Sequence, residues 1–335
     1  MVSKIDFDPD GDVVIKVPRK TECDDEPAEI HMRVSSRHLS LASPVFKVLL
    51  NGKFQEACSF RDSGNVTISL PDDDPNVLET LFNIIHGRLR QVPPVYKRQW
   101  MCKLAVYVDK YELHEITSFF FKCWKNEADP FPEVLDKDLL DTLALSWIFS
   151  DDDLFSKMAR VAFKQADGPI VNESPLSLPL LNDLLGNAAP SYTKWILLTS
   201  SLPAVIDRER LVCLQNSFDG LQKIVDTYLK QTVCTNKADC DAMVFGGLLK
   251  ELARKSLYPI PRAPFPGIKV GYVESSLSER YFSVPKLCPR TDATCNKLPG
   301  ISKILLQVRA HSQRISLRSV RAKMGRVDKP ESPGT

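Results

Sequence analysis

The sequence predicts an α+β protein, with a small, mostly antiparallel sheet flanked by helices near the N-terminus and a mainly α-helical remainder. Two observations support this prediction. Before residue 71, apolar and polar residues alternate in three short stretches, which is the period of a half-buried strand. From residue 75 onward, apolar residues recur every three or four positions, which is the period of a helix that faces a core. Strands followed by a series of helices are typical of the α+β class.

Two of the three strands are expected to form a hairpin. In residues 13–17, Val13, Ile15 and Val17 alternate with Val14 and Lys16, and Gly11 and Pro18 bracket the stretch. Residues 30–34 repeat the pattern after an acidic turn, and two such stretches joined by a turn favour antiparallel pairing. Residues 66–70 give the third strand, with Thr and Ser on its polar face.

The helices of the first half begin at clear local signals. Ser43-Pro44 and Asp74-Pro75 each place a capping side chain before a proline, and proline suits the first helical position. Residues 97–125 then hold an almost unbroken helical pattern in two apolar parts. The apolar positions of the second part are Ile116, Phe119, Phe120 and Trp124.

This first half resembles the BTB/POZ domain in its fungal variant. The resemblance rests, in order along the chain, on Asp12, Leu39, Ser43 to Phe46, Phe54-Gln55-Glu56, Asp72 to Pro75, Ile84-Ile85-His86 and Val108 to Tyr111. It implies a BTB/POZ-like domain over residues 10–127 that serves as a docking platform and has no catalytic machinery. It also implies that partners are proteins, a cullin-type ubiquitin ligase scaffold among them, with the helical half selecting a substrate.

The resemblance further suggests which residues contact a partner, and it has departures. Relatives usually engage partners near Phe54, Gln55, Glu56 and Tyr111 and on the helices after the third strand. Many relatives carry a His-Arg pair where this chain has Ser35-Ser36. Dimeric relatives often have an extra N-terminal helix, whereas here only a short polar segment precedes the first strand. We therefore expect weak or no homodimerisation through this domain.

The second half is predicted to be a separate, mainly helical domain over residues 135–325. Residues 128–134 contain Asp129-Pro130-Phe131-Pro132 and read as a linker, and residues 326–335 read as a disordered tail. The helices expected just after the linker resemble the helical extension that follows the BTB/POZ domain in many relatives. Residues 211–228 repeat apolar side chains at alternating three- and four-residue spacing, which fits either a coiled-coil surface or an ordinary core helix. Gly220 and the shortness of the run favour the core helix.

Four cysteines in the last third are candidate zinc ligands: Cys234, Cys240, Cys288 and Cys295. Four thiolates can hold zinc tetrahedrally. The gaps inside both pairs are wider than in compact zinc knuckles, although fungal relatives also tend to have a cysteine pair in the comparable segment. A structural zinc site is one interpretation, and ordinary free thiols are the favoured one.

Nothing else in the sequence predicts a cofactor or an enzyme. The His-Glu-x-x-His, Gly-x-Ser-x-Gly, P-loop and dinucleotide-binding patterns are all missing. The acidic clusters at residues 24–26, 72–74 and 151–153 are explained by turns and helix starts. We therefore predict that the chain is not an enzyme. The alternative, a metal-dependent enzyme in the C-terminal half, lacks an identifiable general base.

A basic segment over residues 303–329 leaves a second alternative open. Its lysines and arginines outnumber Asp328, its only acidic residue, which suggests a nuclear regulator with a nucleic-acid contact. The charges are dispersed, no aromatic residue is interleaved, and Ile304, Leu305 and Val308 indicate partial packing. Nucleic-acid binding is therefore the less favoured function.

Composition adds the expected location. The net charge of +2 selects no class of partner, no apolar run is long enough to span a membrane, and the start of the chain is not a signal peptide. An odd number of scattered cysteines fits a reducing compartment, so we expect the cytoplasm, the nucleus or both. The sequence predicts a protein-interaction adaptor or scaffold, and it leaves the identity of the partner open.

Overall fold

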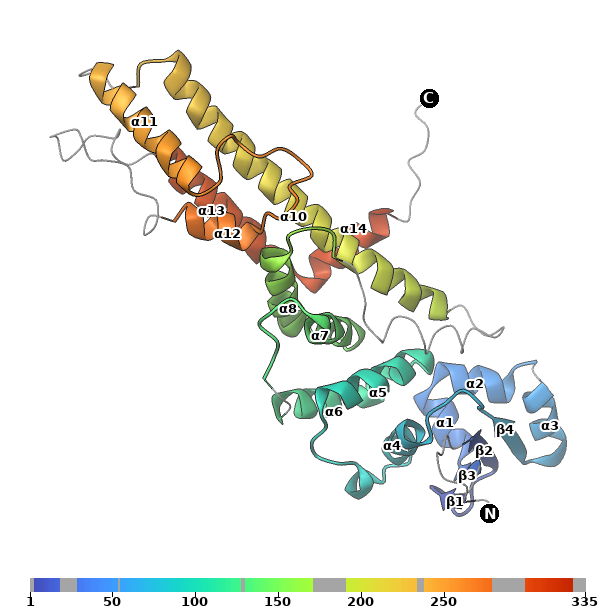
Figure 1. Ribbon diagram of the computed structural model, residues 1–335. Helices are drawn as coiled ribbons and strands as arrows, with labels where there is room; N and C mark the ends of the chain where they lie inside the picture. Colours follow the sequence, from blue (N-terminus) through green and yellow to red (C-terminus); the bar gives the residue numbers. More distant parts are fainter. Residues whose placement is uncertain are drawn as a thin grey trace, which may run out of the picture. The chain divides into compact units, whose positions relative to one another are not determined.

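The computed structural model describes residues 3–18, 29–53, 55–127, 130–170, 191–233, 238–278 and 299–327 (Figure 1). Within these ranges the chain forms thirteen α-helices and one four-stranded sheet, so it has an α+β fold. It divides into two compact units. The first consists of residues 1–131, 144–151 and 173–198, and the second of residues 132–143, 152–172 and 199–335.

The sheet of the first unit has the strand order β1-β3-β2-β4 and is mixed. Strand β2 (Val13–Pro18) pairs antiparallel with β3 (Glu29–Val34), which confirms the pairing expected of the hairpin. Strands β1 (Ser3–Asp6) and β4 (Val66–Ser69) both pair parallel, with β3 and β2 respectively. The prediction of a mostly antiparallel sheet is therefore wrong. The chain passes through three helices before it returns as β4, and such a crossover allows parallel pairing.

One face of this sheet forms the core of the first unit. Val13, Ile15 and Val17 are fully buried, and alternate residues of β4 are buried as well. The close packing extends to the backbone beside β2, because a Cβ atom at Gly11 would lie 2.6 Å from the carbonyl oxygen of Val34. Only glycine fits that position without a shift of the backbone.

Two polar contacts fix the helices that follow the hairpin, α1 (Ser36–Ala42), α2 (Pro44–Asn51) and α3 (Gln55–Ser63). Asp12 accepts hydrogen bonds from the backbone N–H and the hydroxyl of Ser36, both over 2.7 Å. The Ser43 hydroxyl caps α2 by accepting from the N–H of Phe46 over 3.0 Å, and it donates to the carbonyl oxygen of Tyr111 over 2.6 Å. Ser36 thus ties α1 to the sheet in this chain.

The remaining helices of the first unit are α4 (Pro75–Ile85), the 3₁₀ turn η1 (Leu89–Gln91), α5 (Arg98–Lys110) and α6 (His114–Glu127). Asp74 caps α4 by accepting from the N–H of Asn76 over 2.9 Å, as its sequence predicts. The long helical pattern breaks between α5 and α6, where Glu112 has a φ of 51°. That left-handed residue ends α5 and reverses the chain.

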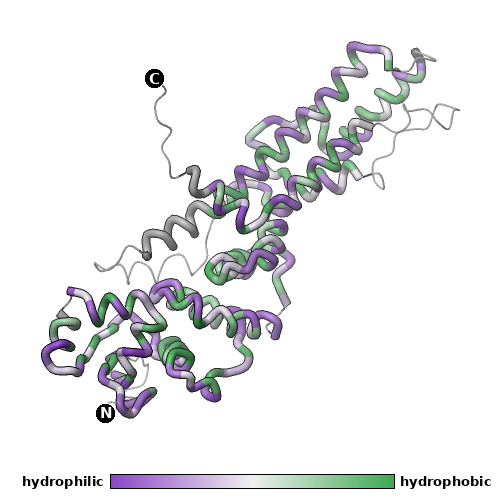
Figure 2. The backbone as a smooth tube through the Cα atoms, turned by 180° about the vertical axis from the view of Figure 1, so that it is seen from behind, coloured by the Kyte–Doolittle hydropathy of each residue, from purple (hydrophilic) through white to green (hydrophobic). Residues whose placement is uncertain are grey.

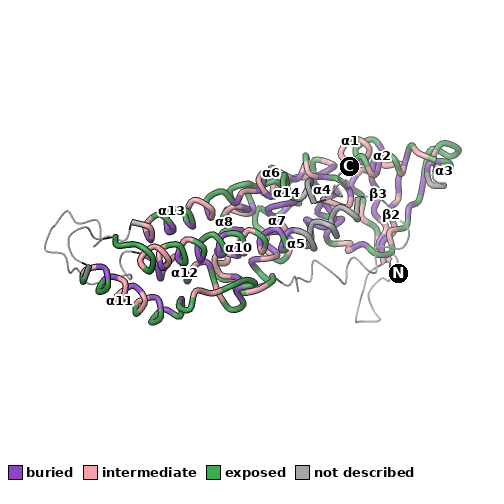
Figure 3. Tube along the Cα trace, turned by 90° about the horizontal axis from the view of Figure 1, so that it is seen from above, coloured by how far each residue is buried: buried purple, intermediate pink, exposed green. Residues whose placement is uncertain are grey.

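The second unit consists of helices. It contains α8 (Asp152–Gln165), α11 (Ala238–Arg254), α12 (Val270–Ser276), α13 (Pro299–Gln313) and α14 (Leu317–Val327). It shares α7 (Lys137–Ile148) and α10 (Ser191–Lys230) with the first unit, to which residues 144–151 and 173–198 belong. Figure 2 shows hydrophobic and hydrophilic residues alternating along these helices. Figure 3 shows the matching alternation of buried and exposed positions.

The heptad-like run on α10 is a core helix. Leu214, Phe218, Leu221 and Val225 are all buried, which confirms the favoured interpretation of this run. A Cβ atom at Gly220 would lie 2.9 Å from the side chain of Ile304 on α13. The glycine therefore permits close packing of two helices.

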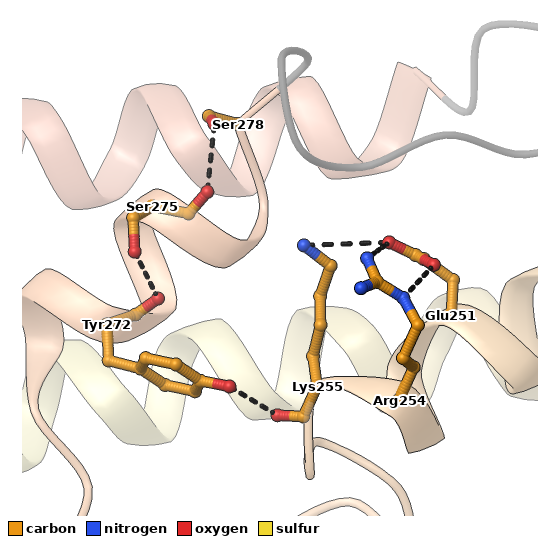
Figure 4. A network of polar contacts seen from close by, with 6 residues as sticks. All are labelled: Glu251, Arg254, Lys255, Tyr272, Ser275 and Ser278. Carbon is orange, nitrogen blue, oxygen red and sulfur yellow. Dashed lines mark hydrogen bonds and ion pairs between the residues drawn. The ribbon is translucent and has the colours of Figure 1, made fainter.

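Ion pairs and hydrogen bonds connect the helices of the second unit. Glu209 on α10 contacts His311 on α13 over 3.0 Å and Lys323 on α14 over 2.8 Å. Figure 4 shows a second network, in which Glu251 pairs with Arg254 over 2.7 Å and the Tyr272 hydroxyl donates to the carbonyl oxygen of Lys255 over 3.0 Å. The Tyr272 contact links α12 to the end of α11.

The proline-rich loop between α11 and α12 is anchored in the second unit. Phe265 in this loop is buried, and its ring centroid lies 5.2 Å from that of Phe218. Its φ of 57° is unusual for a bulky residue and costs roughly 1–3 kcal/mol, which the burial of the ring offsets. The buried ring of Phe265 thus anchors the loop to α10.

The observed segments differ from the expected domain limits at three places. Strand β1 begins at Ser3, so the sheet starts before residue 10. The chain first leaves the first unit between residues 131 and 132, inside the expected linker at 128–134. Helix α14 continues to Val327, past residue 325, and residues 328–335 of the expected tail lie outside the described residues.

Candidate docking surface

Of the four expected partner-binding residues, the structure describes the side chain of Tyr111 alone. Phe54 lies outside the described residues, and Gln55 and Glu56 are the first two residues of α3, whose side chains are not described at these positions. Tyr111 is only 3% exposed, and its ring stacks on Phe46 with centroids 4.6 Å apart. The expectation that Tyr111 contacts a partner directly is therefore wrong, because its side chain lies in the core.

Tyr111 belongs to a buried polar network. Its hydroxyl donates to the carboxylate of Asp73, which also contacts the ammonium group of Lys110. The Asp73 side chain is 0% exposed, and this burial raises the pKa of the carboxyl above its ordinary value, although Lys110 lowers it in part. The network fastens the end of α5 to the turn before α4.

A second polar pair joins α4 to the start of α1. The N–H of Ser35 donates to His86 Nε2 over 3.0 Å, so the Nδ1–H of the same ring donates to the carbonyl oxygen of Phe82 over 2.9 Å. Both ring nitrogens are thus satisfied in the neutral form. Burial lowers the pKa of His86, because the charged form would lose hydration.

The proposed zinc quartet falls mostly outside the described residues. Cys234, Cys288 and Cys295 are not described, and Cys240 is half-buried on α11. Within the described ranges no group of three or more His, Cys, Asp or Glu side chains is arranged to hold a metal ion.

A further cysteine, Cys213, lies on α10. Burial raises the pKa of the Cys213 thiol to about 11, so that thiol is uncharged at neutral pH.

The basic segment is packed on one side and exposed on the other. Ile304, Leu305 and Val308 are buried, as the sequence predicts. Two of its basic residues pair with acids inside the second unit, since Arg309 contacts Glu274 and Lys323 contacts Glu209.

In the described part of the chain, every helix falls short of the length and apolarity that membrane crossing requires.

A row of aromatic side chains in ring contact connects the loop before α5 with α6 in the first unit. We call it the aromatic ridge, and it consists of Tyr96, Trp100, Phe119, Phe120 and Trp124. Tyr96 stacks on Trp100 with centroids 3.9 Å apart and meets Trp124 edge-on at 5.0 Å. Phe120 lies 5.6 Å from Trp124 and 5.8 Å from Phe119. The ridge therefore runs continuously from the loop before α5 to the outer face of α6.

The base of the ridge is rigidly held. Trp124 is 1% exposed, and its indole N–H donates to the carbonyl oxygen of Pro93 over 3.0 Å. The Tyr96 hydroxyl lies 3.2 Å from the Thr80 hydroxyl on α4, and burial raises the pKa of Tyr96. These contacts fix both the loop and the helix faces before any partner binds, which lowers the entropic cost of binding.

The crest of the ridge is open to solvent. Phe119 is 68% exposed and Val95, beside Tyr96, is 48% exposed, while Tyr96, Trp100 and Phe120 are half-buried. Exposed aromatic side chains on a rigid base are typical of the residues that contribute most to protein–protein binding. Leu41 on α1 is more exposed still, at 88%, and serves below as an exposed apolar residue outside the ridge.

Sequence reasoning placed Phe119 on the apolar stripe of a core helix. The helix does bury one face, but its buried residues are Thr117, Phe121 and Trp124. The ridge was missed because Phe119 shares the helical spacing of a core residue, although its solvent exposure differs. The signal that could have found it is the density of aromatic residues between 96 and 124, far above the 8% of the whole chain.

A comparison of the chain with protein-family models gives no match, and a comparison with curated proteins gives no significant match.

Proposed function

We propose that this chain is a protein-interaction adaptor whose first unit is a BTB/POZ-like docking platform. The observation that carries the proposal is the aromatic ridge, because it exposes Phe119 beside Phe120, which in turn contacts the buried Trp124. The resemblance of the sequence to BTB/POZ domains supports the same class of function. The partner surface then lies on α5 and α6, and Tyr111 serves to hold α5 in place rather than to touch the partner.

A cullin-type ubiquitin ligase scaffold is the first partner class to test, with the helical second unit selecting a substrate. Such an adaptor would work in the cytoplasm, the nucleus or both. In this role the chain needs no cofactor and performs no catalysis. Homodimerisation through the first unit is expected to be weak or absent.

The test is a pull-down of a purified fungal cullin by the full chain. The wild-type chain should retain the cullin, and Phe119→Ala should lose at least tenfold of the affinity, since hot-spot truncations often cost more than 1.4 kcal/mol. Leu41→Ala is the control, because it removes an even more exposed apolar side chain from a different helix. A chain that binds no cullin counts against the ligase role. A chain that binds it equally well after Phe119→Ala counts against the ridge.

A further inference from the structure

The charged side chains that border the aromatic ridge balance one another. Five of them lie three or four residues from a ridge residue along α5 or α6, and the sixth is on α4, where its charge acts on Tyr96. All six are exposed, and they are Lys97, Lys103, Lys122, Glu79, Glu115 and Glu127. Because positive and negative charges are equal in number, this border favours neither an acidic nor a basic partner. Binding at the ridge therefore depends on the rings and on uncharged hydrogen bonds.

Two of the polar hydrogens in the ridge are already used inside the first unit. The indole N–H of Trp124 donates to the carbonyl oxygen of Pro93. The Thr80 hydroxyl donates to the carbonyl oxygen of Asn76 over 3.3 Å, so its contact with Tyr96 is one in which the Tyr96 hydroxyl donates. These two groups hold the ridge together and are not available to a partner.

Trp100 supplies the ridge with an open donor. Within the described residues its indole N–H has no hydrogen-bond partner, and Asn83 Oδ1 is the only buried side-chain nitrogen or oxygen there that lacks one, so Trp100 Nε1 is reached by solvent. The ring is held by its stack on Tyr96, with an interplanar angle of 6°. An indole N–H donates and cannot accept, so it matches a ligand that presents free carbonyl oxygens.

The common modes of peptide recognition place different demands on a surface. An added strand needs an open sheet edge, but the ridge lies on two helices and a loop. An amphipathic helix needs a hydrophobic groove, whereas Phe119, at 68% exposed, projects from α6. An acidic or phosphorylated motif needs an excess of positive charge, which the balanced border does not provide. A polyproline II segment needs exposed aromatic rings and a donor for its carbonyls, because its backbone makes no internal hydrogen bonds.

We infer that the aromatic ridge binds a proline-rich segment of a partner protein in the polyproline II conformation. Its proline rings pack on Phe119 and on the stack of Tyr96 and Trp100, and one of its carbonyl oxygens accepts a hydrogen bond from the Trp100 indole. This inference rests on the proposed docking function and adds the composition and conformation of the bound segment. Because proline fixes φ, such a segment is close to its bound conformation before it binds, which lowers the entropic cost.

The experiment is a selection of peptides from a random library displayed on phage, with the purified full chain as bait. The enriched peptides should carry prolines three residues apart, which is one turn of polyproline II. One enriched peptide is then synthesised, together with a version in which alanine replaces its prolines, and that replacement should weaken binding by about tenfold or more. The affinity of the parent peptide should change by less than about twofold between about 50 mM and about 300 mM salt, because no ion pairs are involved.

Variants of the chain locate the peptide on the ridge. Trp100→Phe keeps an aromatic ring but removes the open donor, so binding should weaken by about fivefold. Tyr96→Phe is the matched control, because the hydroxyl that it removes donates to Thr80, and it should leave the affinity within about twofold. Phe119→Ala should weaken binding by about tenfold or more, whereas Leu41→Ala should leave the affinity unchanged. Circular dichroism of each variant confirms that it is folded.

The outcomes separate this inference from the proposed function. Peptides that need Phe119 but lack prolines, that bind Trp100→Phe as well as the wild-type chain, or whose affinity falls steeply with salt overturn the proline-rich partner and keep the docking surface. A selection that enriches no peptide dependent on Phe119 also overturns the inference, and the cullin pull-down with Phe119→Ala then decides the docking function by itself.

Discussion

The indole N–H of Trp124 donates a hydrogen bond to the carbonyl oxygen of Pro93 over 3.0 Å and thereby ties α6 to the loop that carries Val95 and Tyr96. This bond connects the buried base of the aromatic ridge to the loop from which Tyr96 enters it. The ridge is thus built into the packing of the first unit. Its shape should therefore depend on a residue that no partner can reach.

Trp124→Phe should lower the free energy of unfolding by about 1–3 kcal/mol, because it removes the hydrogen bond and part of a buried ring. It should also weaken partner binding, because the loop at residues 93–96 loses its anchor. Urea denaturation and the cullin pull-down measure the two effects. Trp100→Phe, at a half-buried site on the same ridge, is the control for stability and should cost less. Equal stability losses in the two variants would contradict the role of the Pro93 bond.

Asp73→Asn should lower the free energy of unfolding by about 2–4 kcal/mol. The substitution leaves Lys110 without its buried carboxylate partner, and removing one member of a buried ion pair is strongly destabilising. Asp72→Asn makes the same chemical change at the neighbouring, exposed residue and should lower the free energy of unfolding by less than about 0.5 kcal/mol. Thermal or urea unfolding measures both. Similar losses for the two variants would show that the network around Tyr111 is not holding α5.

His86 should make the first unit less stable in mild acid. Burial lowers its pKa in the folded state below the ordinary value of 6.5, so the unfolded chain binds more protons than the folded chain as the pH falls. The stability that depends on neutral His86 is therefore present above pH 6.5 and is lost as the pH falls through the folded-state pKa.

The measurement compares urea midpoints at about pH 7.5 and about pH 5 for the wild-type chain and for His86→Gln. The wild-type chain should lose more stability on acidification than the variant, whose side chain does not titrate. His114→Gln removes a histidine on α6 that is 42% exposed and should keep the wild-type loss. An identical pH dependence in wild type and His86→Gln would refute this assignment.

Two glycines in helices of the second unit should respond to alanine with opposite signs. Gly246 on α11 has open space where a Cβ atom would lie, so Gly246→Ala should stabilise the protein by about 0.5–1 kcal/mol through helix propensity. At Gly220 the added methyl group would meet Ile304 at 2.9 Å, so Gly220→Ala should be destabilising despite the same gain in propensity. Thermal unfolding of both variants tests this, and stabilisation by Gly220→Ala would mean that α10 and α13 pack less closely than described.

Local signals in the sequence predicted much of the first unit. The caps at Ser43 and Asp74 could be recognised because a capping side chain and the following proline act within a few residues. The hairpin of β2 and β3 could be recognised for a similar reason. Strand β1 could not, because its four residues have no apolar alternation and it forms only by pairing with β3, far along the chain. The parallel position of β4 likewise depends on a long crossover.

The candidate surface was harder to predict than the fold. Helical spacing identifies apolar faces, but it does not tell which apolar residue faces the core and which faces solvent when a helix carries Phe119, Phe120 and Phe121 in succession. For Tyr111 the error is the opposite one. The resemblance to BTB/POZ domains suggested that this residue contacts a partner, whereas its hydroxyl donates a hydrogen bond to the buried carboxylate of Asp73. Both decisions depend on tertiary packing, which one sequence does not display.

Site-specific photo-crosslinking at position 119 in the full chain tests the docking surface most directly. The residue is replaced by the photo-reactive p-benzoylphenylalanine in cells, with the same replacement at position 41 as the exposed control. The ridge should give a discrete protein adduct at 119 that is missing at 41 and that mass spectrometry identifies as one partner. No adduct at 119, or the same adducts at both positions, would contradict the assignment of α5 and α6 as the docking surface.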